Sequence, residues 1–151
     1  MLERFAKFSF ALNQLYRYWH QLTSDEMYAY DLRGPHSVYL LAIYNHPEGL
    51  SATQLCEICG RDKADVSRTM ACLENKGIVA KEGDLQNHYR GVYKLTDLGM
   101  EAAEHVCRRA SLAVELAGRD LTPEDRAAFY RALESITGNL HKLSKEGLPK
   151  T

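Results

Sequence analysis

Hydrophobic residues recur every three or four positions at both ends of the chain, the spacing of one face of an α-helix. Near the N-terminus they are Phe5, Phe8, Leu12, Leu15, Trp19 and Leu22. Near the C-terminus they are Phe129, Leu133, Ile136, Leu140 and Leu143. Such a stripe is typical of a helix that packs along another helix, within one core or between subunits. Because both ends of a chain of 151 residues carry one, we expect both helices to form a homodimer interface.

A further helix of about four turns is predicted between Asp62 and Gly77. Asp62 can cap the free N–H groups at its start, and a glycine commonly ends a helix. Val66, Met70 and Leu73 form its inward stripe. The opposite face carries small, basic and hydrogen-bonding side chains, namely Ala64, Ser67, Arg68, Ala71 and Asn75. Such a face can enter a DNA groove and reach base edges and phosphates, although an ordinary amphipathic surface helix has a similar pattern.

The flanks of this helix favour the DNA-binding interpretation. Upstream, Ser51 and Gln54 have the spacing of a capping box, and Gly60 ends a short helix whose apolar stripe is Ala52, Leu55, Cys56 and Cys59. Two helices joined by a tight turn have helix-turn-helix spacing. Downstream, the β-favouring runs 78–81 and 91–95 bracket the polar stretch 82–90, which predicts a hairpin with a long, charged tip.

The remaining segments predict more helices. Gly34-Pro35 starts a helix that runs to Asn45, and its apolar residues Val38, Leu41 and Ala42 are expected to form a buried brace under the DNA-facing helix. The stretch 27–33 before it is the least regular part of the first third. After the hairpin, Thr96 caps a helix to about Arg119, and Thr122-Pro123 starts a last helix to about Lys145. The expected fold class is therefore mainly α with a small β-hairpin wing.

In this order of elements, two motifs carry a family resemblance. Residues 73–79, Leu-Glu-Asn-Lys-Gly-Ile-Val, follow the helix-turn-helix, and residues 95–99, Leu-Thr-Asp-Leu-Gly, follow the polar wing. The chain resembles the winged helix-turn-helix of the MarR family of bacterial transcription regulators over nearly its whole length. The resemblance implies one domain, 1–151, with a DNA-binding part at 33–96 and dimerisation helices at 1–32 and 97–151.

The resemblance also implies contacts with double-stranded DNA. Wings of the family usually carry Asp-x-Arg, but this chain has His88-Tyr89-Arg90, one residue closer to Leu95-Thr96 than the family pattern. We expect Arg90 to enter the minor groove with His88 beside it. The full expected DNA-binding set is Ser51, Thr53, Arg61, Lys63, Ala64, Ser67, Arg68, Ala71, Asn75, His88 and Arg90.

Charge and composition limit the kind of partner and the compartment. The net charge is −1, and residues 60–95 hold seven basic and five acidic side chains. This modest local surplus argues against indiscriminate coating of nucleic acid and favours specificity through few contacts. The chain lacks the patterns of a signal peptide and of a membrane span, so we expect a cytoplasmic protein with no membrane partner.

Aromatic side chains in the first third suggest a ligand pocket. Tyrosine combines an apolar ring with a polar tip and suits a small aromatic ligand, although ordinary packing explains these residues equally well. An arginine among them could meet a carboxylate, so a small aromatic acid is the expected effector. The candidate residues are Tyr16, Trp19, His20, Tyr28, Tyr30, Arg33, His36 and Tyr39.

The cysteines and histidines do not indicate catalysis. Cys56 and Cys59 form a Cys-x-x-Cys, but a second such pair or a histidine pair at zinc-finger spacing is missing, so we expect both to be structural. Of the thiols, we expect Cys72, beside the DNA-facing side chains, to be the exposed one. We find no nucleophile with an attendant base and no phosphate-binding loop. We therefore predict no enzyme activity, no metal and no cofactor.

The function that fits these features is sequence-specific transcription regulation. We favour a homodimeric repressor that binds an inverted-repeat operator and is released by the effector, because blocking a promoter requires only binding. Two alternatives stay open. One is a helical dimer whose winged-helix domain binds protein, and the other is a regulator switched by thiol oxidation.

Overall fold

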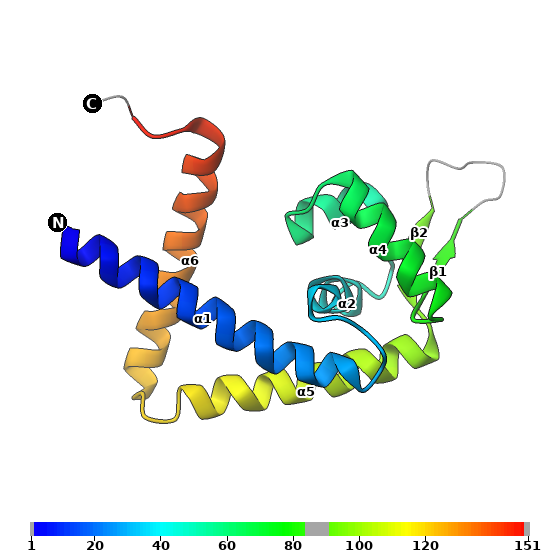
Figure 1. Cartoon of the computed structure of the whole chain (residues 1–151), viewed down its shortest axis with the longest axis horizontal. Coiled ribbons are helices and arrows are strands. Elements are labelled where there is room, and N and C mark those ends of the chain that lie inside the picture. Colours follow the sequence, from blue (N-terminus) through cyan, green and yellow to red (C-terminus); the bar gives the residue numbers. More distant parts are fainter. Residues whose placement is uncertain (1, 84–90, 150–151) are drawn as a thin grey trace. The chain divides into compact units, whose positions relative to one another are not determined.

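The computed structural model of the protein describes residues 2–83 and 91–149. The helices and strands of this part, shown in Figure 1, are α1 (Leu2–Tyr28), η1 (Gly34–His36), α2 (Ser37–Tyr44), α3 (Ala52–Cys59), α4 (Lys63–Asn75), β1 (Val79–Glu82), β2 (Val92–Leu95), α5 (Asp97–Ala117) and α6 (Pro123–Glu146). The strands β1 and β2 form an antiparallel hairpin in which Val79 lies opposite Leu95. The predicted class, mainly α with a β-hairpin wing, is confirmed.

The helix starts follow the predicted capping residues. The Asp62 carboxylate accepts a hydrogen bond from the Asp65 amide at 2.8 Å and caps α4. Ser51 and Gln54 form the reciprocal capping box of α3, and the Thr122 hydroxyl accepts from the Asp125 amide at the start of α6. Each cap satisfies an amide that the helix itself cannot pair, so these side chains determine where the helices begin.

The region between α1 and α2 differs from the prediction. The helix α1 continues through residue 27 to Tyr28, because Met27 is fully buried in the core and stabilises the last turn. Pro35 lies in the short 3-10 helix η1, and α2 begins only at Ser37. Leu41, predicted to be buried, is 48% exposed, whereas Tyr39, Leu40 and Ile43 face the core. A short helix that is apolar all round gives no periodicity from which to identify its inner face.

The core lies in the unit that ends at Ser111. It brings together side chains from α2, α3, α4 and the hairpin with the first half of α5. Its largest fully buried members are Met27, Leu32, Tyr39, Leu40, Ile43, Leu50, Leu55, Val66, Met70, Leu73 and Ile78. The predicted brace α2 therefore does lie in the core, through Ala42 as predicted and through Tyr39, Leu40 and Ile43 rather than Leu41.

The start of α5 is joined by hydrogen bonds to the end of α4 and the residues that follow it. The Thr96 hydroxyl accepts a hydrogen bond from the Gly99 amide and donates to the carbonyl of Gly77. The Thr96 amide donates to the carbonyl of Ile78 at 3.1 Å. A Cβ at position 99 would lie 1.9 Å from that carbonyl oxygen, so only glycine fits. We refer to these four residues as the Thr96 joint.

The chain divides into two compact units, Met1–Ser111 and Leu112–Thr151. The first unit includes α1, because Glu26 of α1 accepts from Arg109 Nε at 2.7 Å and contacts His105 Nε2 at 2.9 Å, both on α5. These two bases hold the pKa of Glu26 below its ordinary value, mainly through the hydrogen bond from Arg109. The expected division into a DNA-binding part at 33–96 and dimerisation helices on either side describes function, not compact units. It stays a prediction.

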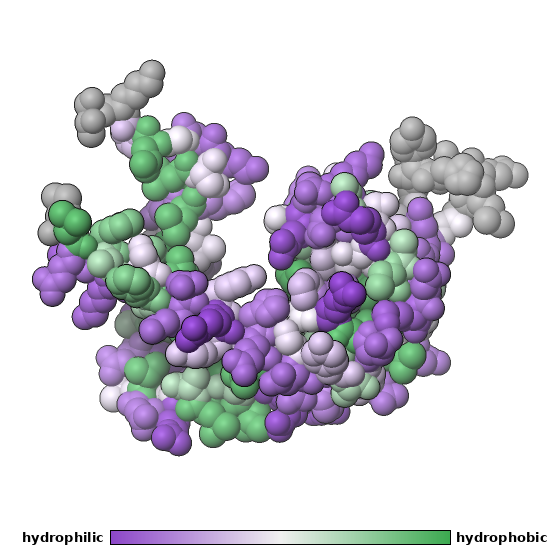
Figure 2. All heavy atoms as spheres, in the orientation of Figure 1, coloured by the Kyte–Doolittle hydropathy of each residue, from purple (hydrophilic) through white to green (hydrophobic). Residues whose placement is uncertain are grey.

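The two predicted interface stripes are exposed in the single chain. Phe5 of α1 is 70% exposed and Leu133 of α6 is 45% exposed, and α6 has no buried residue at all. Figure 2 shows hydrophobic residues on the surface of both helices. Contiguous exposed apolar surface of this kind is typical of an interaction site. None of the described helices is both long enough and apolar enough to cross a lipid bilayer.

Candidate nucleic-acid interface

The helix α4 has one buried and one exposed face, as its sequence predicts. Val66, Met70 and Leu73 are at most 1% exposed. All five residues predicted for the opposite face are solvent-exposed, namely Ala64, Ser67, Arg68, Ala71 and Asn75. The exposed face is free of large apolar side chains, so nothing on it obstructs close approach to a groove.

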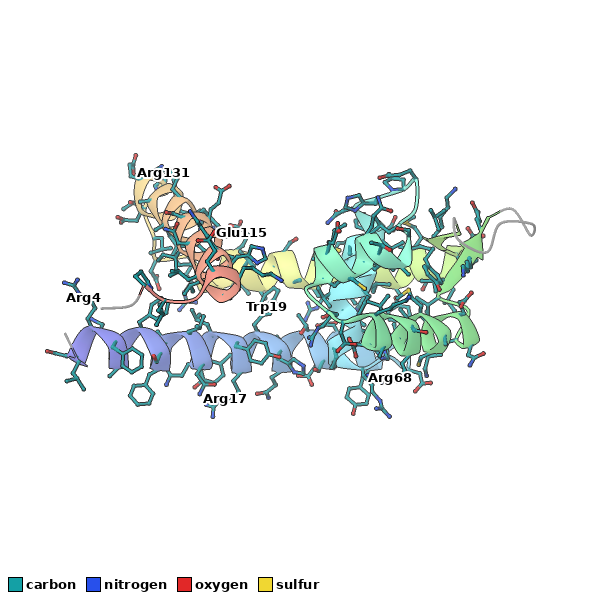
Figure 3. All side chains as sticks on the ribbon, turned by 90° about the horizontal axis from the view of Figure 1, so that it is seen from above. Arg4, Arg17, Trp19, Arg68, Glu115 and Arg131 are labelled. Atoms are coloured by element: carbon teal, nitrogen blue, oxygen red, sulfur yellow. The ribbon has the colours of Figure 1, made fainter. Side chains whose placement is uncertain are left out.

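Basic side chains gather around the N-terminal turns of α4. Arg61 and Lys63 are exposed, and the side chain of Arg68 is 74% exposed. Figure 3 shows Arg68 projecting outward from α4. The partial positive charge of the helix N-terminus adds to these cations, so this end of α4 favours an anionic partner.

The helix α3 contributes less than the sequence predicts. The Ser51 hydroxyl is used by the capping box, where it accepts from the Gln54 amide at 3.2 Å. It can still donate its own proton to a phosphate oxygen. Thr53, two residues later, is exposed and makes no side-chain hydrogen bond within the described part of the chain.

The base of the wing carries two lysines and one glutamate. Lys94 of β2 pairs with Glu82 of β1 at 2.7 Å, and the ammonium group of Lys81 lies 5.6 Å from the centre of the Tyr93 ring. Both lysines are therefore engaged along the hairpin. The predicted wing contacts His88 and Arg90 lie outside the described residues.

A side-chain hydrogen bond joins α4 to the core. The hydroxyl of Tyr39, a residue of α2 that is only 1% exposed, donates to Asp65 Oδ2 at 2.5 Å. Burial, and then the hydrogen bond to Asp65, raise the pKa of Tyr39 far above its ordinary value, so its hydroxyl stays a donor. Asp65 Oδ1 lies 3.9 Å from the Arg68 guanidinium. The local sequence pattern does not predict this contact, because Tyr39 and Asp65 are 26 residues apart.

A pocket of about 460 Å³ lies between the end of α1 and α4. Tyr28, Arg33 and His36, all predicted ligand residues, line it. Its other lining residues are Asp31, Leu32, Asp65, Arg68, Thr69, Cys72 and Lys76. The α4 side of the pocket could not be read from the sequence, since nothing in the local pattern brings α1 and α4 together.

The other predicted ligand residues lie elsewhere. Tyr16 and His20 contact each other on α1 with ring centres 5.8 Å apart, and Trp19 is 42% exposed beside them. Tyr30 packs near His105 with ring centres 5.6 Å apart, and Tyr39 is committed to the core. These five side chains therefore do not line the pocket.

The pocket is lined by three cationic and two acidic side chains. Asp31, which has a positive φ of 53°, pairs with Lys76 at the end of α4, and Asp65 is engaged by Tyr39. Burial, and then the charge of Arg33, lower the pKa of His36, so this imidazole is neutral at pH 7. The side chains of Arg33 and Arg68 are the cations best able to meet an anionic ligand there.

The thiols follow their expected placement. Cys56 and Cys59 are partly buried against the core, and burial raises the pKa of Cys59 to about 11. A thiol with such a pKa is unreactive at neutral pH. Cys72 is partly exposed at the pocket. Among residues 2–83 and 91–149, no group of three or more histidine, cysteine or acidic side chains could hold a metal ion.

Comparisons with known proteins identify relatives of this fold. The sequence model of the MarR family matches residues 30–88. No curated protein matches the sequence. Three solved structures illustrate the structural likeness. A MarR family regulator from Listeria monocytogenes complexed with 26mer DNA is 19% identical, with a TM-score of 0.79 over 93% of this chain and 95% of that one.

The other two solved structures resemble this chain to a similar degree. The MepR–DNA complex of Staphylococcus aureus is 19% identical, with a TM-score of 0.78 over 88% of this chain and 96% of that one. A MarR regulator from Methanosarcina mazei is 20% identical, with a TM-score of 0.80 over 91% and 99%. The family match includes α2, α3, α4 and β1 but ends before β2, and the shared fold covers nearly the whole chain. The chain is therefore similar to the MarR family of winged helix-turn-helix transcription regulators in the sequence of residues 30–88 and in its fold.

Proposed function

We propose that this regulator is a homodimeric repressor that binds an inverted-repeat operator in double-stranded DNA. The exposed face of α4 carries the proposal, because it combines small residues with an outward arginine at a helix end that favours anions. Two of the similar structures, from Listeria monocytogenes and Staphylococcus aureus, are complexes with DNA. A transcription regulator of the MarR type carries out no catalysis, so we infer that the protein is not an enzyme.

The exposed stripes of α1 and α6 support the homodimer. A dimer presents two copies of α4, and two helices that enter successive major grooves require half-sites about 10 bp apart. Selection of bound sequences from random duplex DNA tests the proposal. An inverted repeat with that spacing is the expected product, whereas a single unrepeated site bound by a monomer would exclude it.

The alternative function is that the winged domain binds a protein. The salt dependence of binding distinguishes this alternative from DNA binding. Binding to DNA releases counterions, so the operator affinity must fall steeply as the salt concentration rises. Docking of a protein on an apolar face does not require that dependence. A selected operator whose dissociation constant is nearly independent of salt would favour the alternative.

Replacement of Arg68 by alanine is expected to relax operator specificity at one base position. An arginine that reads a base edge supplies roughly 1–3 kcal/mol of discrimination. Lys63→Ala, in contrast, should weaken operator and random DNA alike, because a lysine on phosphate carries no sequence information. The comparison requires the affinity of each variant for the selected operator and for random duplex DNA, measured by titration. Equal losses on both DNAs for Arg68→Ala would show that Arg68 does not read a base.

The pocket beside α4 supports control by a small aromatic acid. Arg33 offers a guanidinium to the carboxylate, and Tyr28 offers a ring beside it. Because α4 forms one wall, a ligand that prefers one position of α4 would shift the equilibrium between DNA-bound and free protein. It can do so only by the difference in its affinity for the two states.

Salicylate-like acids are expected to release the dimer from its operator, and Arg33→Gln should weaken that release. Cys72→Ser should respond to the acids as the wild type does, because it keeps both groups of the proposed ligand contact. Parallel titrations with peroxide test the thiol alternative. If peroxide alone releases DNA and Cys72→Ser abolishes the effect, oxidation of Cys72 replaces the ligand as the switch.

A further inference from the structure

An acidic side chain lies where the proposed DNA interface needs positive charge. Asp65 is in the first turn of α4, three residues before Arg68, and its side chain is 37% exposed. The N-cap of this helix is already supplied by Asp62, so capping does not require a second carboxylate there. A carboxylate near DNA phosphates opposes binding. The position of Asp65 therefore calls for a separate explanation.

The two oxygens of Asp65 have different surroundings. Oδ2 accepts the hydrogen bond from the buried Tyr39 hydroxyl at 2.5 Å, and Oδ1 faces the Arg68 guanidinium at 3.9 Å. Tyr39 cannot move easily, because it is 1% exposed within the core. The hydrogen bond from Tyr39 thus fixes the Asp65 carboxylate. Its other oxygen, Oδ1, faces Arg68, whose side chain is mostly exposed to solvent.

We propose that Asp65, fixed by Tyr39, is a positioning residue that orients Arg68 for base reading and raises the specificity of operator binding at the expense of general affinity. This inference rests on the proposed function, in which Arg68 contacts a base. An exposed ion pair of this kind adds little stability, but it restricts the orientations of a long side chain. An arginine without this restraint could bind any nearby phosphate through its planar fork and would discriminate less between sequences.

The test compares Asp65→Asn with the wild type on the selected operator and on random duplex DNA. Affinity for random DNA should rise about two- to fivefold, because an acid is removed from the interface. The ratio of the two affinities should fall roughly tenfold, with the loss of preference confined to the base that Arg68 reads. Tyr39→Phe should act in the same direction with a smaller effect. Neither change should alter base preference once Arg68 is alanine.

Two control variants separate positioning from general effects. Asp62→Asn removes a negative charge from the same helix end while keeping a capping side chain, so it should change both affinities alike. Tyr44→Phe removes a hydroxyl from another, partly buried tyrosine of α2, and thermal unfolding of both tyrosine variants reveals any loss of folding.

The outcomes distinguish this inference from the proposed function. If Arg68→Ala changes the base preference but Asp65→Asn does not, the positioning role is wrong and Arg68 reads DNA unaided. If Asp65→Asn changes both affinities by the same factor as Asp62→Asn, Asp65 acts only through its charge, which also overturns the inference. If Arg68→Ala leaves the base preference unchanged, the failure lies in the assignment of Arg68 itself.

Discussion

Simultaneous replacement of Leu12 and Leu140 by aspartate is expected to yield monomers or unfolded chains that no longer hold the operator. Both leucines are about half exposed in the single chain and lie on the apolar stripes of α1 and α6. In a dimer the double variant would bury four carboxylates, which is costly without partners. A monomer also loses the second DNA contact, and linked binding typically raises affinity by about 10²–10⁴. Operator affinity should fall at least about 100-fold.

Sedimentation equilibrium and operator titration measure the two parts of this prediction. A matched control is Gln21→Asp with Ala127→Asp, which adds the same charge on the opposite faces of the same helices. The control should stay dimeric and bind normally. A folded Leu12→Asp/Leu140→Asp monomer with full operator affinity would remove these helices from the interface and the dimer from the mechanism.

Gly99→Ala is expected to destabilise the winged domain by about 3 kcal/mol or more, near or above the upper end for overpacked sites. The added Cβ would lie 1.9 Å from the Ile78 carbonyl oxygen and 3.0 Å from its carbon. Because the obstacle is backbone, a side-chain rotation cannot relieve the clash. The carbonyl that must move also accepts the hydrogen bond from the Thr96 amide, so the Thr96 joint opens with it. The midpoint of urea unfolding measures the loss.

Gly138→Ala provides the control in another helix. Nothing lies within 4 Å of a Cβ at this position of α6, on the side away from its apolar stripe. Alanine lowers the entropy of the unfolded chain and should stabilise the helix by about 0.5–1 kcal/mol. If Gly99→Ala unfolds within about 0.5 kcal/mol of the wild type, a size at which surface substitutions usually fall, the close approach of α5 to Ile78 is not tight in solution.

Local signals in the sequence predicted most of the fold. Asp62, Ser51 and Thr122 mark helix starts because capping depends on residues three positions apart, and such short patterns can be read directly. The inward stripe of α4 was equally clear. Where the local signal was weak, the prediction was wrong, as at Leu41 of the uniformly apolar α2 and at the last turn of α1.

Contacts between distant segments could not be predicted in this way. The exposed face of α4 follows from its own periodicity, but the hydrogen bond from Tyr39 to Asp65 and the ion pair of Asp31 with Lys76 join residues 26 and 45 positions apart. The pocket depends on the same long-range approach of α1 to α4. This is why three of the eight predicted ligand residues line it and the other five, chosen for aromatic character alone, do not.

The Thr96 joint connects the end of α4 directly to the start of α5. A 21-residue helix is about 31 Å long, so a tilt of about 5° at its far end carries the joined end sideways by about 3 Å. Hydrogen bonds to base edges do not survive a displacement of that size. If α4 reads operator bases as proposed, a small rotation of α5 near residue 117 would therefore be enough to break its contacts with DNA. A stiff joint, rather than a flexible one, is what would make such a regulator easy to switch.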